Sequence, residues 1–208
     1  MGEDILQTDP NTCHVKSSLQ GLDLLVVQEL FMTETARIAD VVFPASSFLE
    51  KEGTFTNGER RIQKVQQAVE PLEGTKPDGQ IVVDMMRRMG YPQEGYSADV
   101  ILKEIAGIVP FFKGVRWDEL GNNGKQWPVR EDGTDTKILH TETFKRGKGK
   151  FHSWDYDISP ELDENAARYP YILTTGRLLE HYNSGTMTRR TPNSKIVTED
   201  LLFIHPHD

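Results

Sequence analysis

The chain has 208 residues, of which 37% are hydrophobic and 27% charged, and its formal net charge at pH 7 is -8. This length accommodates one large domain or two small ones with a core of ordinary size. The acidic balance argues against a broad surface for nucleic acid or anionic lipid, because either partner would be repelled. Since the apolar runs are too short to cross a bilayer, we expect a cytoplasmic protein with no nucleic-acid or membrane partner.

The only cysteine is Cys13. A single cysteine excludes an internal disulfide, and it cannot by itself hold an iron–sulfur cluster or a structural zinc ion. A nucleophile or metal ligand beside His14 is the alternative, but the local spacing matches no recognised motif, and we favour a buried or bystander thiol. His205 and His207 have no partner at zinc-binding spacing, so we predict no metal ligand in the chain.

The first part of the chain has the pattern of an α/β unit. Residues 23–28 form a continuous apolar run, which is typical of a strand buried on both faces of a parallel sheet. A segment that suits one or two helical turns follows, and residues 40–44 then read as a second short strand. Residues 50–61 are polar and contain glycine, and the apolar spacing of residues 62–69 indicates extended structure.

Two helices are predicted next. The apolar spacing over residues 80–89 fits a helix that stops at Gly90. Ser97 is a suitable cap for a second helix, which continues up to Pro110. These helices complete the first α/β region.

The remaining chain changes in character. Residues 114–150 are rich in glycine and polar residues and read as a long irregular connection, in which Trp117 and Trp127 anchor the chain to the body of the protein. Strands are predicted at residues 169–176 and 201–204. A natural domain rarely ends after one or two strands that have nothing to pair with, so we expect a truncated chain.

Three short segments resemble anion-binding turns of α/β proteins. They are residues 2–4, 53–57 and 174–177, where glycine and hydroxyl side chains offer donors after strand-like segments. Each of them also fits an ordinary chain reversal.

Residues 176–190 carry a richer set of polar groups. Guanidinium groups suit phosphates or the edges of a pterin. A specific anionic partner and a solvated surface loop both remain open for this segment. Its potential cations and neutral polar side chains are Arg177, His181, Arg189, Arg190, Asn183, Ser184, Thr186 and Thr188.

Several ordered motifs together resemble the catalytic subunit of formate dehydrogenases in the molybdopterin oxidoreductase superfamily. Four of them lie in the first part of the chain: MGEDILQTD at residues 1–9, LVVQELFMTETA at 25–36, ADVVFP at 39–44 and EGTFTNGERR at 52–61. Two more lie near the end: YPYILTTGR at 169–177 and HYNSGTMT at 181–188. They extend over nearly the whole chain, so a chance similarity is improbable.

This resemblance implies a bis(molybdopterin guanine dinucleotide) cofactor carrying molybdenum or tungsten, and the oxidation of formate to carbon dioxide. It implies that residues 1–110 are part of a Rossmann-like α/β domain with a parallel sheet. Residues 111–165 would be an irregular connector. Residues 166–208 would be the first strands of a β-barrel-like molybdopterin dinucleotide-binding domain.

The resemblance also implies that the chain is an internal fragment. In the family, the cysteines of a 4Fe-4S cluster and the cysteine or selenocysteine that binds the metal lie upstream, and Cys13 does not match the metal-ligand position. We therefore expect no catalytic residue in the chain, and no activity of the chain alone. Its partners would be the remainder of the large subunit and electron-transfer subunits.

Individual positions carry over from the family motifs. Gly2, Asp4 and Thr8 match contacts to one pterin–guanine dinucleotide, where backbone donors suit phosphate and a carboxylate suits guanine N–H groups. Arg177 and His181 match positions near the pterin or its phosphates. Gln28 either shapes the cleft or contacts the cofactor, as do Gly53 and Asn57, and a relative carries serine at the position of Asn183. The predicted cofactor-binding residues are Gly2, Asp4, Thr8, Gln28, Arg177, His181, Asn183 and Ser184.

Two alternatives remain at this point. Another member of the superfamily, such as a nitrate reductase, shares the TETA and ADVV segments, whereas the EGTFTN and HYNSGTMT strings favour formate dehydrogenase. A noncatalytic pterin-binding module is the alternative from a different functional class.

Overall fold

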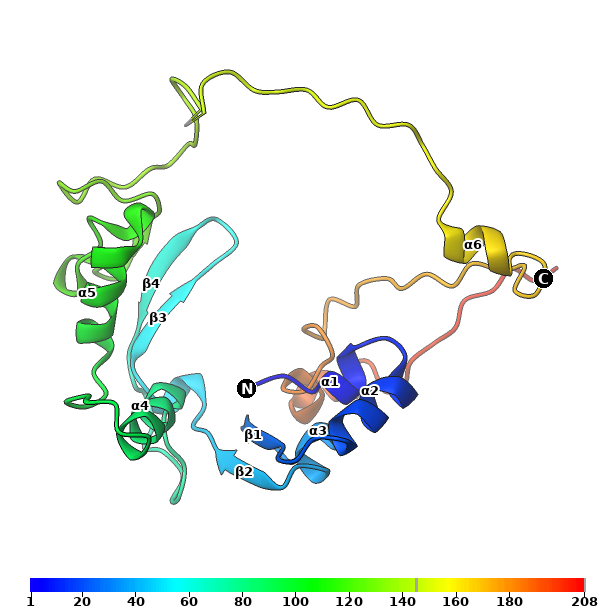
Figure 1. Cartoon of the computed structure of the whole chain (residues 1–208), viewed down its shortest axis with the longest axis horizontal. Coiled ribbons are helices and arrows are strands. Elements are labelled where there is room, and N and C mark those ends of the chain that lie inside the picture. Colours follow the sequence, from blue (N-terminus) through cyan, green and yellow to red (C-terminus); the bar gives the residue numbers. More distant parts are fainter. Residues whose placement is uncertain (145, 208) are drawn as a thin grey trace. The chain divides into compact units, whose positions relative to one another are not determined.

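The computed structural model describes residues 1–144 and 146–207. The chain divides into two compact units, Met1–Leu139 and His140–Asp208, and each is described by itself. The first unit contains a parallel and an antiparallel sheet together with helices (Figure 1). The predicted α/β class is therefore confirmed at the level of a mixed α/β structure.

The parallel sheet is formed by β1 (Val26–Glu29) and β2 (Val41–Pro44) (Figure 1). Helix α3 (Glu34–Arg37) lies between these strands in the sequence. Successive side chains of a strand point to opposite faces of the sheet. Because the last three residues of β1 are all buried, both faces of this strand are covered. This confirms the predicted strand, short helix and second strand. Helix α3 begins after Thr33, whose hydroxyl accepts a hydrogen bond from the Ala36 N–H at 3.2 Å.

The antiparallel sheet has the order β3 (Gly53–Thr56), β4 (Arg61–Val65) and β5 (Lys125–Gln126). The extended structure predicted after residue 61 is thus confirmed for β4. The short β5 lies inside the segment predicted to be irregular, and only its pairing with β4 defines it.

Two helices follow the β3–β4 hairpin, as predicted: α4 (Asp78–Arg88) and α5 (Ala98–Ile108). Ser97 occupies the N-cap position of α5, as predicted, but its side chain does not cap the helix. The Ser97 hydroxyl donates to the Asp99 carboxylate and makes no cap hydrogen bond to a backbone N–H. The reason is that an ionised carboxylate in the first turn is the stronger partner for a hydroxyl.

The other short elements were not predicted from the sequence. The α-helices are α1 (Ile5–Thr8), α2 (Thr12–Gln20) and α6 (Pro160–Asn165). The 3-10 helices are η1 (Phe48–Glu50), η2 (Pro110–Phe112), η3 (Trp117–Glu119), η4 (Thr188–Arg190) and η5 (Pro192–Lys195). Within the described residues, no helix is long and apolar enough to cross a bilayer.

A small hydrophobic core joins α5 to the antiparallel sheet and to the segment that follows. Burial of each such side chain stabilises the fold by about 1.5–3 kcal/mol. Trp117 and Trp127 pack against this core, which confirms their predicted role as anchors. The core residues are Ile62, Leu102, Val115, Leu120 and Val129.

Arg60 connects the hairpin to the chain after β5. Its guanidinium donates to the carbonyl oxygens of Trp127, Thr136 and Lys137, the last at 2.9 Å. It also lies over the Trp127 ring, 5.7 Å from the ring centroid. These contacts, together with the core, give the irregular segment a defined path.

The strands predicted at residues 169–176 and 201–204 are not formed. Among the described residues of the second unit there is no strand, and side chains such as Leu173 and Phe203 are 80% and 87% exposed. A strand needs a neighbour to complete its backbone hydrogen bonds, and the described part of the unit supplies none.

Two glycines before β5 allow a stability prediction. Gly121 and Gly124 both have positive φ angles, but a Cβ atom would meet open space at Gly121 and would lie 2.2 Å from the Ile62 carbonyl oxygen at Gly124. Gly121→Ala should cost only about 1–2 kcal/mol of backbone strain. Gly124→Ala should cost about 1–3 kcal/mol more, because the β4 backbone must shift. Chemical denaturation measures both, and equal losses would contradict the structure.

Glu50 gives a pH-dependent prediction. This buried carboxylate accepts hydrogen bonds from the backbone N–H groups of Ser47 at 2.7 Å and Leu72 at 3.0 Å. The bonds from Ser47 first, and that from Leu72, hold its pKa below the ordinary value of 4.5. Because the native state favours the ionised form, this stabilisation is present above the pKa of the unfolded chain and is lost as the pH falls through the lowered pKa.

Glu50→Gln should therefore lose less stability than the wild type between neutral pH and about pH 3. Urea denaturation at several pH values measures the difference. Glu73→Gln, at an exposed carboxylate, is the control and should follow the wild-type pH profile. The same acid dependence in the wild type and the Glu50→Gln variant would show that the carboxylate is not stabilised in this way.

Candidate functional site

The first predicted cluster lies at the carboxyl end of β1, where α/β sheets usually bind their ligands. The Gly2 N–H donates to the Gln28 carbonyl oxygen at 2.9 Å, so the chain before α1 runs beside the end of this strand. Gly2 has a φ of 61°, and no atom lies within 4 Å of the place that a Cβ would occupy. The structure thus brings Gly2 and Gln28 together and leaves space beside the Gly2 backbone.

Asp4 follows Gly2 and is almost fully buried, with 3% of its surface exposed. Its carboxylate accepts hydrogen bonds from the Thr35 N–H at 3.0 Å and the Thr35 hydroxyl at 2.6 Å. The Thr35 hydroxyl oxygen in turn accepts a hydrogen bond from the Leu6 N–H at 3.1 Å. Asp4 therefore ties α1 to the N-terminus of α3, and its direct contact with a cofactor stays a prediction.

Thr8, at the end of α1, is exposed. Its hydroxyl donates to the Glu3 carboxylate at 2.6 Å. An anionic ligand that approached Thr8 would have to take over this hydrogen bond and move the Glu3 carboxylate aside. The hydroxyl is accessible, but it is not poised for phosphate in the present arrangement.

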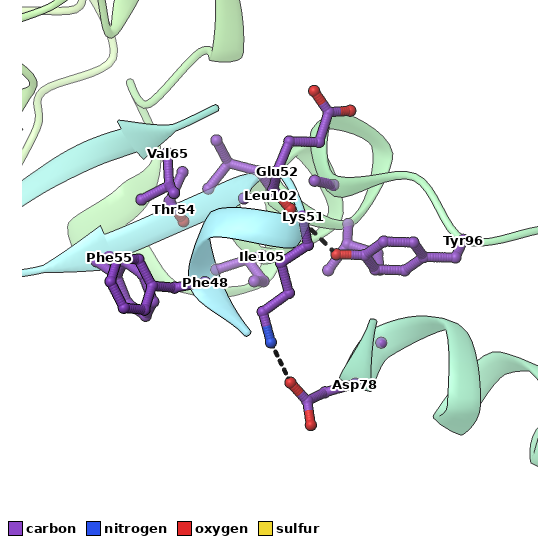
Figure 2. Close-up of a pocket in the computed structure, with 14 residues that line it drawn as sticks. Phe48, Lys51, Glu52, Thr54, Phe55, Val65, Asp78, Tyr96, Leu102 and Ile105 are labelled. Carbon is purple, nitrogen blue, oxygen red and sulfur yellow. Dashed lines mark hydrogen bonds and ion pairs between the residues drawn. The ribbon is translucent and has the colours of Figure 1, made fainter. Parts of the chain in front are cut away.

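Sequence reasoning missed two charged residues beside Gln28. The Gln28 side-chain amide donates to Asp78 Oδ1 at 2.7 Å, and the Lys51 ammonium pairs with the other oxygen of Asp78 (Figure 2). Burial by itself would raise the pKa of Asp78, but the hydrogen bonds from Lys51 and Gln28 outweigh it and lower this pKa. The signal in the sequence was the position of Asp78 just before the helix predicted over residues 80–89.

A cavity of about 280 Å³ lies beside this ion pair, between η1, β3 and α5 (Figure 2). Its walls are mainly apolar and include Phe48, Phe55 and Ile105. Tyr96 lies at one side, and burial, together with the nearby negative charges of Glu52 and Asp78, raises its pKa. None of the eight predicted cofactor residues lines this cavity.

The second predicted cluster lies in the second unit, around η4. Arg177 Nη1 donates to Asn183 Oδ1 at 3.3 Å, and His181 Nδ1 lies 3.2 Å from the Thr188 hydroxyl oxygen. The Ser184 hydroxyl oxygen lies 3.0 Å from that of Thr186. Asn183 has a left-handed backbone with a φ of 51°, which asparagine tolerates better than most residues. The local turns thus bring Arg177 to Asn183, whereas His181 and Ser184 contact Thr188 and Thr186.

The second cluster contains a buried ring nitrogen. His181 Nε2 is buried and has no hydrogen-bond partner among the described residues. Arg189 is paired with Asp200 at 2.8 Å and is less suited to a ligand. A buried ring nitrogen without a partner is costly unless a ligand or water satisfies it.

Other candidate chemistry is limited. Within the described residues, no group of three or more His, Cys, Asp or Glu side chains could hold a metal ion. Cys13 lies in α2 and is exposed, so it is not a buried thiol, and its role as a bystander stays a prediction. The rings of His205 and His207 contact each other at a tilt of 42°, with centroids 5.3 Å apart.

The chain is similar to known proteins along its whole length. The molybdopterin oxidoreductase family model matches residues 1–88. The alpha subunit of F420-dependent formate dehydrogenase 2 from Methanococcus maripaludis is 42% identical to this chain. The match covers 100% of this chain and 31% of that subunit. A putative formate dehydrogenase from Staphylococcus aureus is 44% identical over 93% of the chain and 20% of its own length.

The fold is also similar to a solved structure. The match with acetylene hydratase from Pelobacter acetylenicus covers 91% of this chain and 29% of the hydratase chain, with a TM-score of 0.54 and 21% sequence identity. At this identity the likeness concerns the fold alone. The chain spans about a third of the length of the archaeal relative. Residues 1–88 thus match the molybdopterin oxidoreductase family, and the chain over its full length is similar to alpha subunits of formate dehydrogenases.

Proposed function

We propose that this chain is the part of a formate dehydrogenase alpha subunit that helps to hold a bis(molybdopterin guanine dinucleotide) cofactor with molybdenum or tungsten. The complete enzyme would oxidise formate to carbon dioxide. The observation that carries this proposal is the similarity of the whole chain to the F420-dependent formate dehydrogenase alpha subunit at 42% identity. This similarity favours formate dehydrogenase over the alternatives of a nitrate reductase or a noncatalytic pterin-binding module.

The side chains present fit a large phosphorylated heterocyclic ligand. Gly2 offers open space beside its backbone at the carboxyl end of β1, so a ligand can approach closely there. In the second unit, the buried His181 Nε2 without a protein partner points to a missing hydrogen-bonding group. Arg177 adds a guanidinium group suited to phosphate oxygens.

When bound, the cofactor supplies the redox chemistry, and the protein supplies binding and orientation. In this proposal Arg177 makes charge-assisted hydrogen bonds to the cofactor, and the Ser184 hydroxyl donates to its polar atoms. Thr8 contributes only when its hydroxyl leaves the Glu3 carboxylate. His181 and Asn183 complete the contacts of the second cluster. Asp4 holds α1 against α3. Its carboxylate also contacts the guanine directly in this proposal.

The larger organisation is proposed on the same basis. Residues 1–110 would belong to a Rossmann-like domain, residues 111–165 to a connector, and residues 166–208 to a barrel-like dinucleotide-binding domain whose strands pair with polypeptide beyond this segment. The 4Fe-4S cluster, the metal ligand and the docking sites of electron-transfer subunits would lie elsewhere in a cytoplasmic enzyme.

Arg177→Met in the complete alpha subunit should lower cofactor retention by about tenfold, because a charge-assisted hydrogen bond is lost. Fluorescence of the oxidised pterin released from purified protein measures this retention. Arg168→Met is the matched control, because Arg168 lies over the Tyr169 ring outside the predicted cluster, and it should retain the pterin. Equal retention in both variants would remove Arg177 from the site.

The 208-residue chain alone should not oxidise formate, because the proposal places the 4Fe-4S cluster and the protein ligand of the metal in other parts of the alpha subunit. Purified chain incubated with formate and an artificial electron acceptor tests this expectation, with the complete subunit as the positive control. Formate-dependent reduction of the acceptor by the isolated chain would overturn it.

A further inference from the structure

A basic segment lies near the start of the second unit, in a chain that is acidic overall. Residues 143–154 contain four of the 24 lysine and arginine residues and no acidic residue, whereas the whole chain has a net charge of -8. Arg146, Lys148 and Lys150 are exposed. Among the residues that the structure describes, none forms an ion pair with these three. The segment is therefore a local positive charge that the described part of the chain does not neutralise.

A tight turn holds the beginning of this segment. The Gly147 N–H donates to the Phe144 carbonyl oxygen at 2.9 Å, and the Phe144 ring contacts the His140 ring, with centroids 4.8 Å apart. Gly147 has a φ of 84°, a conformation that glycine adopts without strain. The cations on either side of Gly147 thus extend from a turn with a defined backbone.

Large aromatic side chains follow the cations. Phe151, Trp154 and Tyr156 are 100%, 87% and 90% exposed. Within the described residues, the backbone groups of residues 148–158 make no hydrogen bonds to other backbone groups, and this stretch runs toward α6 without helix or strand (Figure 1). Aromatic residues and arginine are enriched at protein–protein interfaces, and exposed apolar side chains that lie together mark interaction sites. The segment therefore has the composition of a binding surface.

The cations decide which kind of partner covers this surface. Lysine and arginine side chains are almost never fully buried unless they are paired, and the burial of several like charges inside one subunit would cost free energy. We therefore expect residues 146–150 to stay on the surface of the complete alpha subunit, although this chain spans only 31% of the related alpha subunit. A separate protein can reach them there.

The short length of the basic segment favours a compact acidic surface over a long polyanion. The five residues 146–150 span at most about 18 Å, and the carboxylates of Asp155, Asp157 and Asp163 follow along the chain. An extended nucleic acid would run from the cations onto these carboxylates and be repelled. A protein that carries a small group of carboxylates can meet the cations alone.

We propose that residues 146–156 form a docking surface for an acidic patch on the protein that takes electrons from the alpha subunit. Arg146, Lys148 and Lys150 attract and orient this partner, and the aromatic side chains become buried when it binds. The inference rests on the proposed function, because a formate dehydrogenase passes the electrons of formate to another redox protein. Attraction between opposite charges accelerates such docking and makes it depend on salt.

The first test reverses the charge in the complete alpha subunit. Lys148→Glu combined with Lys150→Glu should weaken the binding of the copurifying electron-accepting subunit by about tenfold in dilute buffer. At about 1 M salt the difference should fall below about threefold, because the screening length is then about 3 Å. Lys148→Arg combined with Lys150→Arg should bind like the wild type, since the charge is kept. Biolayer interferometry measures this binding.

The matched control is Lys16→Glu combined with Lys103→Glu, because both lysines are exposed and the net charge changes equally. This control should bind within about twofold of the wild type. Equal weakening in the two double variants would overturn the proposal, as would an alpha subunit that binds no electron-accepting protein. Formate oxidation with an artificial acceptor should be the same in all variants, and its loss in the Lys148 and Lys150 variant would also overturn the proposal.

Hydrogen exchange locates the surface. The backbone amides of residues 148–156 should exchange rapidly in the complete alpha subunit alone and slowly after the electron-accepting subunit binds. Slow exchange in the alpha subunit alone would show that its own polypeptide covers the segment, and this result would overturn the proposal. Binding of single-stranded polyuridylate that is lost in the Lys148→Glu and Lys150→Glu variant would assign the surface to nucleic acid and would likewise overturn it.

The proposed function and this inference fail in different ways. A wild-type alpha subunit that contains no pterin would overturn the proposed function, and with it the identity of the docking partner. The binding and exchange outcomes above overturn this inference alone, because they leave the pterin content of the subunit unchanged.

Discussion

The buried hydrogen bonds between Asp4 and Thr35 are the interaction on which the first cluster depends. They join α1 to α3 across 31 residues of sequence and hold the segment that carries Gly2 beside the end of β1. Both partners are 3% exposed, so removal of the Asp4 carboxylate would leave the buried Thr35 N–H and hydroxyl without their acceptor, at a cost of about 1–3 kcal/mol. Asp4, which the sequence predicts to contact the ligand, therefore has a structural role: it holds α1 against α3.

The two candidate clusters are built in different ways. In the first unit, Gly2, Gln28 and Asp78 come from separate elements, and long-range hydrogen bonds bring them together. In the second unit, the side-chain contacts of Arg177, His181 and Ser184 are all made within residues 177–188, and no described strand supports them. The first cluster depends on tertiary structure, whereas the second depends mostly on local backbone conformation.

The differences from the sequence predictions have a common cause. The strands predicted at residues 169–176 and 201–204 have suitable side chains, but a strand forms only when a neighbour completes its hydrogen bonds. The opposite case is β5, which has little strand character of its own and exists because it pairs with β4. Ser97 occupies its expected place but bonds to Asp99, a competing partner that a capping rule does not weigh.

The sequence by itself determined the family resemblance, the positions of β1, β2, α4 and α5, and the local gathering of polar residues after Arg177. These features depend on residue patterns over short stretches of sequence, such as the regular spacing of apolar residues. Only the tertiary structure decided that Asp4 faces Thr35 and that Asp78 meets Gln28 across 50 residues. The physical reason is that a hydrogen bond needs its partners about 3 Å apart in space, and separation along the chain does not specify that distance.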